Sequence, residues 1–459
     1  MRGIAFLCIF LSSLPFIFVS PFYGVLIWYA FSFGNFHTMT WGFLDNLYYA
    51  YIIVLLTCIS WVFSRSEKIR LPLTPLVILT LLFSVWMTIT SLLALGPAEE
   101  MWNTWIFIHK MLLMCLVGYA LTTTRERVNQ LIWVVALSVG FWGVKGGISV
   151  ILHGGNVDVG IRGPEGGVTA ANNEFGLALV MILPLLFYQQ QTAINRHLRR
   201  ALMIMGFLIC LAIVFTFSRG AFLALCASGA VFWLRSRFKF ATGALMLVVG
   251  LCVYLLAPQA WFDRMRTIET YEQDSSAQGR IDFWRISLRI AELHPVLGGG
   301  FKVTYFPEIT NRMLEGTTLP RLKIPRATHS IWFDALSEHG WVGLALFVAI
   351  AGYSLYNCSW LIRHTRGRPD LDWANLLGRM GQSALVGFWA AGTFNSVAYF
   401  DEYWTIIFIF DAARRVVAKE ITTPVNAFRS APSTGAAQVG TTSAAALVRS
   451  DRSSGFAKS

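Results

Sequence analysis

A histidine with basic neighbours, His329, lies where a long polar loop meets an apolar run, in the stretch Arg326-Ala-Thr-His-Ser330. A neutral imidazole near pH 7 is well suited to removing a proton from a hydroxyl group. The same loop carries Arg321 and Lys323. Some of the basic residues in this loop could instead contact lipid phosphates. A histidine that only begins a helix is the bland alternative. A base beside several fixed cations predicts chemistry on a phosphate-activated substrate at a membrane surface.

Arginines in other loops extend this cationic site. Arg219 stands between two apolar runs with only Ser218 and Gly220 beside it. A charge at the membrane is costly and marks a functional site by default, although an arginine can also snorkel to the interface. Arg280 and Arg162 lie in polar loops, where a solvated surface charge is the alternative. Guanidinium groups bind phosphate oxygens bidentately. The predicted diphosphate-binding set is Arg219, Arg280, Arg162 and Arg326.

A second set of polar residues is predicted to support the site. Lys110 and Lys145 lie within apolar runs and could extend the cationic funnel, or could snorkel or pair with a carboxylate. Glu338 could orient or bridge polar groups, and His339 could do no more than cap or pack. The predicted supporting residues are Glu338, Lys110, Lys145 and Ser218.

The residue pattern favours catalysis without a metal or a cofactor. No second ligand stands at metal spacing from His329, since His339 is ten residues away. The seven cysteines all fall inside apolar runs and contain no CxxC pair, so we expect small hydrophobic side chains and no disulfides. The sequence contains no P-loop. The reaction must therefore draw its energy from an activated substrate or an ion gradient.

The elements that must position these residues are membrane helices. The chain of 459 residues is 55% hydrophobic and 14% charged, whereas soluble domains carry about a quarter charged residues. Apolar runs of about 18 residues or more recur throughout, each long enough to cross a bilayer. We predict an all-α polytopic protein with about twelve spans, at 3–33, 44–63, 72–94, 104–121, 128–152, 174–188, 199–217, 220–235, 239–257, 330–361, 373–394 and 400–418.

Charge sorts the loops between these spans. Clusters at 65–70, 125–127, 196–200, 235–239 and 363–368 fall on one side, which the positive-inside rule assigns to the cytoplasm. Residues 3–33 are too long for one straight span and contain prolines, but the parity of the basic loops favours a single kinked or tilted span there. Both termini are then cytoplasmic. The net charge of +12 is spread over these loops, which argues against a nucleic-acid partner.

The predicted organisation has four parts. Nine spans with short loops occupy 1–257, a large periplasmic loop occupies 258–328, three further spans occupy 329–420, and a disordered cytoplasmic tail occupies 421–459. The large loop is basic, but long loops translocate largely regardless of charge. Its stretch from Gly279 carries apolar residues at helical spacing, which predicts an amphipathic helix on the membrane surface. The predicted apolar face comprises Ile281, Trp284, Leu288 and Ala291.

At these residues the chain resembles the O-antigen ligase and O-antigen polymerase superfamily, most closely the ligases. The likeness covers about residues 160–400 and rests on several short motifs in order. The N-terminal region is also similar to O-glycosylation ligases associated with exosortase systems. The motifs are Ser218-Arg219-Gly220, Arg280 with Trp284, His294-Pro295-Val-Leu-Gly298-Gly-Gly300, His329-Ser330, and Glu338-His-Gly340-Trp-Val-Gly343.

This resemblance implies a metal-independent, inverting glycosyltransferase with a glycosyltransferase-C-like fold in the bacterial inner membrane. The donor would be a glycan on undecaprenyl diphosphate, and the acceptor in the ligase branch would be lipid A–core oligosaccharide. Arg219 and Arg280 would hold the diphosphate, and His329 would be the base on the acceptor hydroxyl, at a site facing the periplasm. Membrane lipids would surround the protein.

Two alternatives share or replace this chemistry. The motifs do not separate a ligase from an O-antigen polymerase or from a transferase that glycosylates a protein, because all three use the same lipid-linked donor. A polysaccharide transporter or lipid flippase is a rival of another class. Such a protein would distribute functional charges through the membrane midplane and show two related halves, whereas this chain concentrates its candidate residues on one face.

Overall fold

The structure, a computed structural model, describes residues 2–39, 48–64, 67, 70–154, 160–236, 238–266, 275–324 and 326–422. These residues are helical or irregular, and no strand occurs among them. The chain divides into one compact unit, residues 1–418, and a second unit, residues 419–459. The predicted disordered tail lies outside the described residues except at its start, where a helix continues to Thr422.

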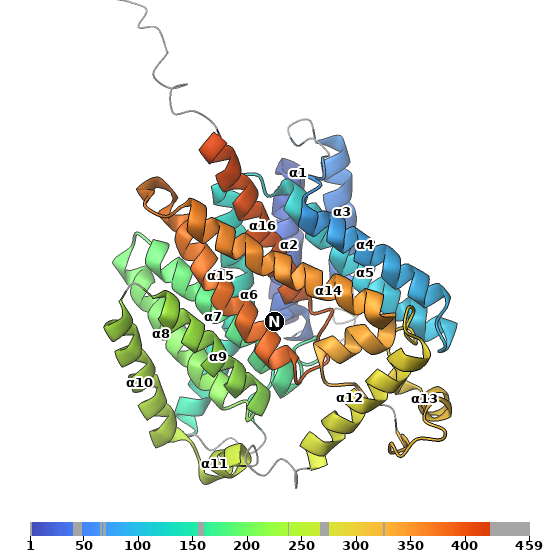
Figure 1. Cartoon of the computed structure of the whole chain (residues 1–459). Helices are drawn as coiled ribbons and strands as arrows, with labels where there is room; N and C mark the ends of the chain where they lie inside the picture. Colours follow the sequence, from blue (N-terminus) through green and yellow to red (C-terminus); the bar gives the residue numbers. More distant parts are fainter. Residues whose placement is uncertain are drawn as a thin grey trace, which may run out of the picture. The chain divides into compact units, whose positions relative to one another are not determined.

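The helices α1 to α10 make up the first part of the compact unit, in the residues that the structure describes (Figure 1). Local sequence signals set several of their starts. Thr74, Thr124 and Ser218 are N-caps whose side chains accept a backbone N–H from the first turn that follows. The helices are α1 (Arg2–Val19), α2 (Pro21–Gly34), α3 (Tyr49–Phe63), α4 (Pro75–Leu92), α5 (Ala98–Leu121), α6 (Arg125–Leu152), α7 (Asn172–Thr192), α8 (Arg196–Val214), α9 (Arg219–Arg235) and α10 (Lys239–Leu256).

The first predicted span is wrong, because residues 3–33 fold as a hairpin of two helices. Ser20 breaks the helix and caps the next one, with Pro21 at its first position. The rings of Phe6 and Phe31 pack with centroids 5.4 Å apart, so the start of α1 lies beside the end of α2. The prediction of a cytoplasmic N-terminus assumed a single crossing by residues 3–33, and two helices do not support that assumption.

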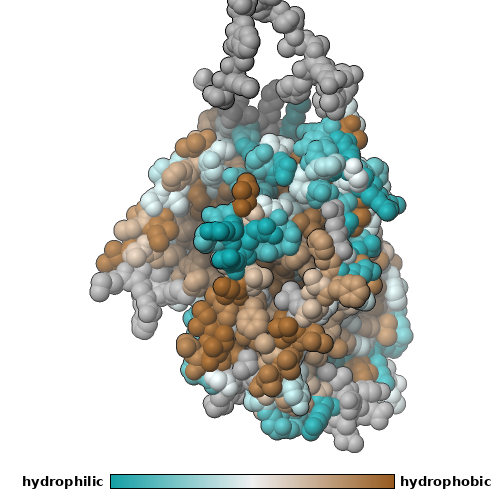
Figure 2. Space-filling view, turned by 90° about the vertical axis from the view of Figure 1, so that its left-hand side faces the viewer, coloured by the Kyte–Doolittle hydropathy of each residue, from teal (hydrophilic) through white to brown (hydrophobic). Residues whose placement is uncertain are grey.

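Six helices are long and apolar enough to cross a membrane by length and composition, or up to seven if the bent pair α10 and α11 (Gln259–Arg266) is one span. The six, found among the described residues, are α4, α5, α6, α7, α8 and α14. Figure 2 shows the face that carries α8 and α10, where a broad hydrophobic area lies below hydrophilic residues. Exposed side chains such as Met203, Phe240 and Leu247 belong to these helices. The chain is a multi-pass helical membrane protein, and the count of twelve spans stays a prediction.

The large loop carries structure of its own, as its length and pattern predict. It holds α11, α12 (Ser275–Leu293), η3 (Val303–Tyr305) and α13 (Pro307–Met313). The helix predicted from Gly279 is present as α12, and it packs on α14. Its predicted apolar face is wrong in part. Ile286 and Ile290 are fully buried, whereas Leu288 is 39% exposed, because neighbouring elements cover a different side of the helix.

Three helices close the compact unit: α14 (Ile331–His364), α15 (Asp372–Gly392) and α16 (Asp401–Thr422). α15 packs against α7, α9 and α14, which places it at the centre of the helical core. α14 is not one straight helix, because Gly340 has φ 67° and ψ −170° and breaks it sharply. The short segment before the break and the long segment after it therefore run in different directions (Figure 1).

Candidate functional site

A cavity of about 470 Å³ brings together four of the residues predicted from the sequence, Arg219, Arg280, Arg326 and His329. A further arginine, Arg264 of α11, joins them. No carboxylate occurs among the described residues that line this cationic cavity. Among the described residues, its lining is Asn172, Asn173, Phe217, Arg219, Gly220, Arg264, Gly279, Arg280, Phe283, Arg326 and His329.

A tight turn between α8 and α9 positions Arg219. Phe217, in this turn, has the left-handed φ of 56°, which a residue with a side chain rarely adopts. Ser218 then caps α9 by accepting the N–H of Ala221 at 3.2 Å. The result is that Arg219, the first residue of α9, is only 9% exposed and yet lines the cavity. Ser218 itself is buried and outside the lining, so its contribution is to the turn.

Two helices begin at the cavity wall. Asn172 is the first residue of α7, Arg219 is the first residue of α9, and both line the cavity. The first N–H groups of a helix lack intrahelical partners and carry partial positive charge, so a helix N-terminus attracts anions. The helix N-termini and the guanidinium groups therefore both make the electrostatic potential of the cavity more positive. The cavity is a cationic environment that favours anions.

His329 lies half-buried at the cavity wall, just before α14. Its backbone is left-handed, with φ 55°, and its N–H donates to Ser396 Oγ at 2.8 Å. Burial lowers the pKa of the imidazole below its usual 6.5, and the charges of Arg280 and Arg326 lower it further. The imidazole is therefore neutral at pH 7 and able to accept a proton.

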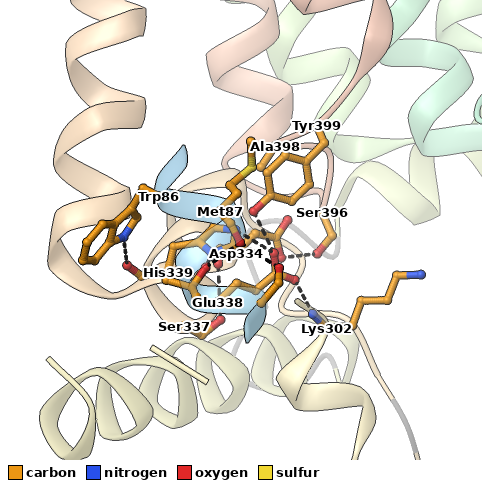
Figure 3. Close-up of polar contacts among 12 residues, drawn as sticks. Trp86, Met87, Lys302, Asp334, Ser337, Glu338, His339, Ser396, Ala398 and Tyr399 are labelled. Carbon is orange, nitrogen blue, oxygen red and sulfur yellow. Dashed lines mark hydrogen bonds and ion pairs between the residues drawn. The ribbon is translucent and has the colours of Figure 1, made fainter. Parts of the chain in front are cut away.

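Behind the cavity, the first segment of α14 carries a buried polar cluster, Asp334, Glu338 and His339 (Figure 3). Glu338 accepts the N–H of Lys302 at 2.7 Å and the hydroxyl of Tyr399 at 2.8 Å, so it joins the large loop to the segment between α15 and α16. Glu338 is buried and does not line the cavity.

The glycine-rich motif at 298–300 packs directly on the break in α14. The N–H groups of Gly299 and Gly300 donate to the carbonyls of Ser337 at 2.8 Å and Glu338 at 2.9 Å. These carbonyls lose helical partners at the break, and the motif replaces them. A Cβ on Gly340 would lie 2.3 Å from the carbonyl oxygen of Val296, so no side chain fits there. Two separate sequence motifs are thus one structural unit.

Besides Ser218 and Glu338, three residues predicted for the site do not line the cavity. Arg162 is exposed on its loop. Lys110 is exposed and lies over the ring of Tyr51, with 4.4 Å between Nζ and the centroid. Lys145 is also exposed and lies 4.8 Å from the centroid of Trp142. The predictions that Arg162 binds the diphosphate and that the two lysines extend the cationic funnel are therefore not supported by this geometry.

Sequence reasoning missed several residues of this region. Arg264 was not predicted, because α11 is short and Arg264 looks like an ordinary surface charge. Asn172 and Asn173 follow a glycine-rich stretch, residues 160–167, and carry no charge, so the sequence gives no signal for them. Asp334 had a usable signal, since it is a carboxylate inside an apolar run four residues after Ser330. The described residues contain no group of three His, Cys, Asp or Glu side chains that could hold a metal, and metal independence stays a prediction.

The class is therefore a multi-pass helical membrane protein whose helix ends enclose a cationic cavity with one histidine. Residues 204–348 match the family model described as O-antigen ligase, which confirms the superfamily resemblance that the motifs indicated. That segment contains every arginine of the cavity and His329, but not Arg162, Lys110 or Lys145. Residues 1–193 match a family of unknown function (DUF5935). A comparison with curated proteins gives no match.

Proposed function

We propose that this protein is a glycosyltransferase of the O-antigen ligase type, which transfers a glycan from undecaprenyl diphosphate to lipid A–core oligosaccharide. The observation that carries this proposal is the cationic cavity, where a neutral histidine faces several arginines and two helix N-termini. The match of residues 204–348 to the O-antigen ligase family supports the reaction class.

The chemistry is one displacement at the anomeric carbon. The acceptor hydroxyl attacks this carbon, His329 takes the hydroxyl proton, and the bond from carbon to phosphate oxygen breaks. The polyprenyl diphosphate leaves with the electron pair, and the configuration at the carbon inverts. Arg219, Arg280 and Arg326 would stabilise the charge that develops on the leaving group. No enzyme nucleophile is needed, and fixed guanidinium groups supply the charge stabilisation that a metal supplies elsewhere.

The position of the cavity fits a donor anchored in lipid. α12 packs on α14 beside it, and six of the described helices are long and apolar enough to cross a membrane. By the distribution of basic loops, this end of the bundle faces the periplasm of a bacterial inner membrane. A polymerase or a protein glycosyltransferase would use the same donor site and differ in the acceptor. A flippase or transporter explains the charges less well, because the cationic residues gather in one cavity.

The choice of acceptor separates the candidate functions. Purified protein, supplied with lipid-linked glycan, is offered lipid A–core, a second lipid-linked glycan, or a candidate acceptor protein such as a pilin. We expect product only on lipid A–core, detected by mass spectrometry. Product on another acceptor with none on lipid A–core would refute the ligase assignment while keeping the transferase chemistry.

Loss of Arg219 tests the donor site. A buried, charge-assisted hydrogen bond contributes about 1.5–3 kcal/mol, so Arg219→Ala should weaken donor affinity roughly 10- to 100-fold. Arg219→Lys should restore little, because an ammonium group cannot bind bidentately. Binding of undecaprenyl diphosphate measured in detergent gives the answer, with Arg162→Ala as the comparison for an exposed loop arginine. Equal affinities in the native and Arg219→Ala proteins would remove Arg219 from the donor site.

A further inference from the structure

We infer that Ser396, held by Asp334, is a positioning residue for His329. This inference rests on the proposed function, in which His329 is the base. Ser396 lies in the segment between α15 and α16, far along the chain from His329, and neither Ser396 nor Asp334 lines the cavity. Their role follows from the directions of the hydrogen bonds around the His329 backbone.

Asp334 fixes the direction of two hydroxyl groups (Figure 3). Its Oδ1 accepts the hydroxyl of Ser396 at 2.9 Å and also the hydroxyl of Thr328. A hydroxyl has one proton to donate and two lone pairs that accept. Once the proton points at Asp334, the oxygen faces other donors as an acceptor. Ser396 Oγ then accepts the N–H of His329 at 2.8 Å, and Thr328 Oγ1 accepts the N–H of Ser330 at 3.4 Å.

These two acceptors meet consecutive N–H groups at a strained point of the chain. His329 has φ 55°, a conformation that costs a residue with a side chain roughly 1–2 kcal/mol. Ser330, the N-cap of α14, is extended, and its own hydroxyl makes no capping bond. Asp334, one helical turn onward, instead orients the hydroxyls of Ser396 and Thr328, which accept the N–H groups of His329 and Ser330 just before the helix. The left-handed turn directs the His329 side chain toward the cavity, and the hydrogen bonds hold that turn.

Asp334 is well anchored for this task. Its side chain is 7% exposed, and its backbone N–H donates to the carbonyl of Ser330 at 2.8 Å, which begins α14. Arg219 and Arg280 line the cavity from α9 and α12, whereas Ser396 lies outside its lining. Loss of the Ser396 hydroxyl should therefore disturb the base and leave the donor site in place.

The test is the kinetic split of Ser396→Ala, measured with purified protein, lipid-linked glycan and the accepted acceptor. A displacement of about 1 Å in a catalytic group costs on the order of 100-fold in rate, so we expect kcat to fall about 10- to 100-fold. Affinity for undecaprenyl diphosphate should stay native. Ser396→Thr, which keeps the hydroxyl, should recover most of the rate. Ser354→Ala, which removes a buried serine hydroxyl that donates to the carbonyl of Ile350 within α14, is the matched control and should keep native kcat.

Three results would overturn the inference: native kcat in Ser396→Ala, donor affinity that weakens as much as kcat, or a Ser396→Thr protein as slow as Ser396→Ala. His329→Ala, run beside them, separates the two levels of the argument. An inactive His329→Ala protein with a native Ser396→Ala protein would refute the positioning role alone. A fully active His329→Ala protein would refute the proposed base and the positioning role together.

Discussion

Two histidines ten residues apart occupy opposite kinds of environment at the start of α14. His329 lines the cationic cavity, and its left-handed backbone directs it there. His339 is fully buried, its Nδ1 lies 2.7 Å from Thr90 Oγ1, and its carbonyl accepts the indole N–H of Trp86 at 2.9 Å. The ring of Phe301 packs edge-on against the His339 ring, with centroids 4.7 Å apart.

The difference teaches that the neighbours of a histidine, rather than its residue type, set its possible role. His339 is held in place by α4 and by the large loop, and it does not line the cationic cavity. His329 has space and cations in front and a hydrogen-bonded backbone behind. We therefore expect His339 to stabilise the fold and His329 to act in the cavity. Substitutions at both ends of this short segment should separate the two roles.

The largest expected effect is on the reaction. His329→Ala should lower glycan transfer about 100- to 10,000-fold, the range that general base catalysis contributes, while thermal unfolding in detergent stays close to native. His339→Ala should do the opposite, with a lower midpoint of unfolding and a smaller loss of transfer in the fraction that stays folded. Equal melting shifts and equal rate losses in the two variants would erase the distinction.

A large effect on stability is expected at the break that follows His339. Gly340→Ala places a side chain in a conformation that is essentially restricted to glycine, and its Cβ would meet the Val296 carbonyl at 2.3 Å. We expect a loss of about 3 kcal/mol in the free energy of unfolding. Gly352→Ala lies in the same helix with open space around it, and should be neutral. Matching denaturation midpoints for the two variants would show that the break is not needed.

The smallest expected effect concerns pH. Arg280 lowers the pKa of His329, so Arg280→Gln should raise that pKa toward 6.5 and increase the protonated, inactive fraction in weak acid. With saturating donor, the ratio of the rate at pH 6 to that at pH 8 should fall about two- to fourfold. Arg285→Gln, an exposed arginine of α12 outside the cavity lining, should leave the ratio unchanged. If the acidic side of the pH–rate profile of Arg280→Gln matched that of the native protein, Arg280 would not influence the pKa of His329.

Much of the helical framework could be predicted from the sequence, because the length of an apolar run decides whether it forms a membrane helix. Each of the twelve predicted apolar segments contains a helix in the part that the structure describes. The exception is instructive, since the run at 3–33 does not reveal whether a break at Ser20 bends the chain slightly or reverses it. The prediction of the buried face of α12 was wrong in part for a related reason. Its spacing allowed more than one apolar stripe, and contacts with other elements decided which one was buried.

The sequence by itself determined that this is a helical membrane protein, and it predicted that the arginines and His329 belong to one side of it. That prediction uses the charge of the loops and the lengths of the spans, without knowledge of packing. Only the tertiary structure decided which of these residues meet. It grouped Arg219, Arg264, Arg280, Arg326 and His329, and it excluded Arg162. It also brought Ser396 to the His329 backbone, because a hydrogen bond between segments 67 residues apart depends on how the helices between them fold back.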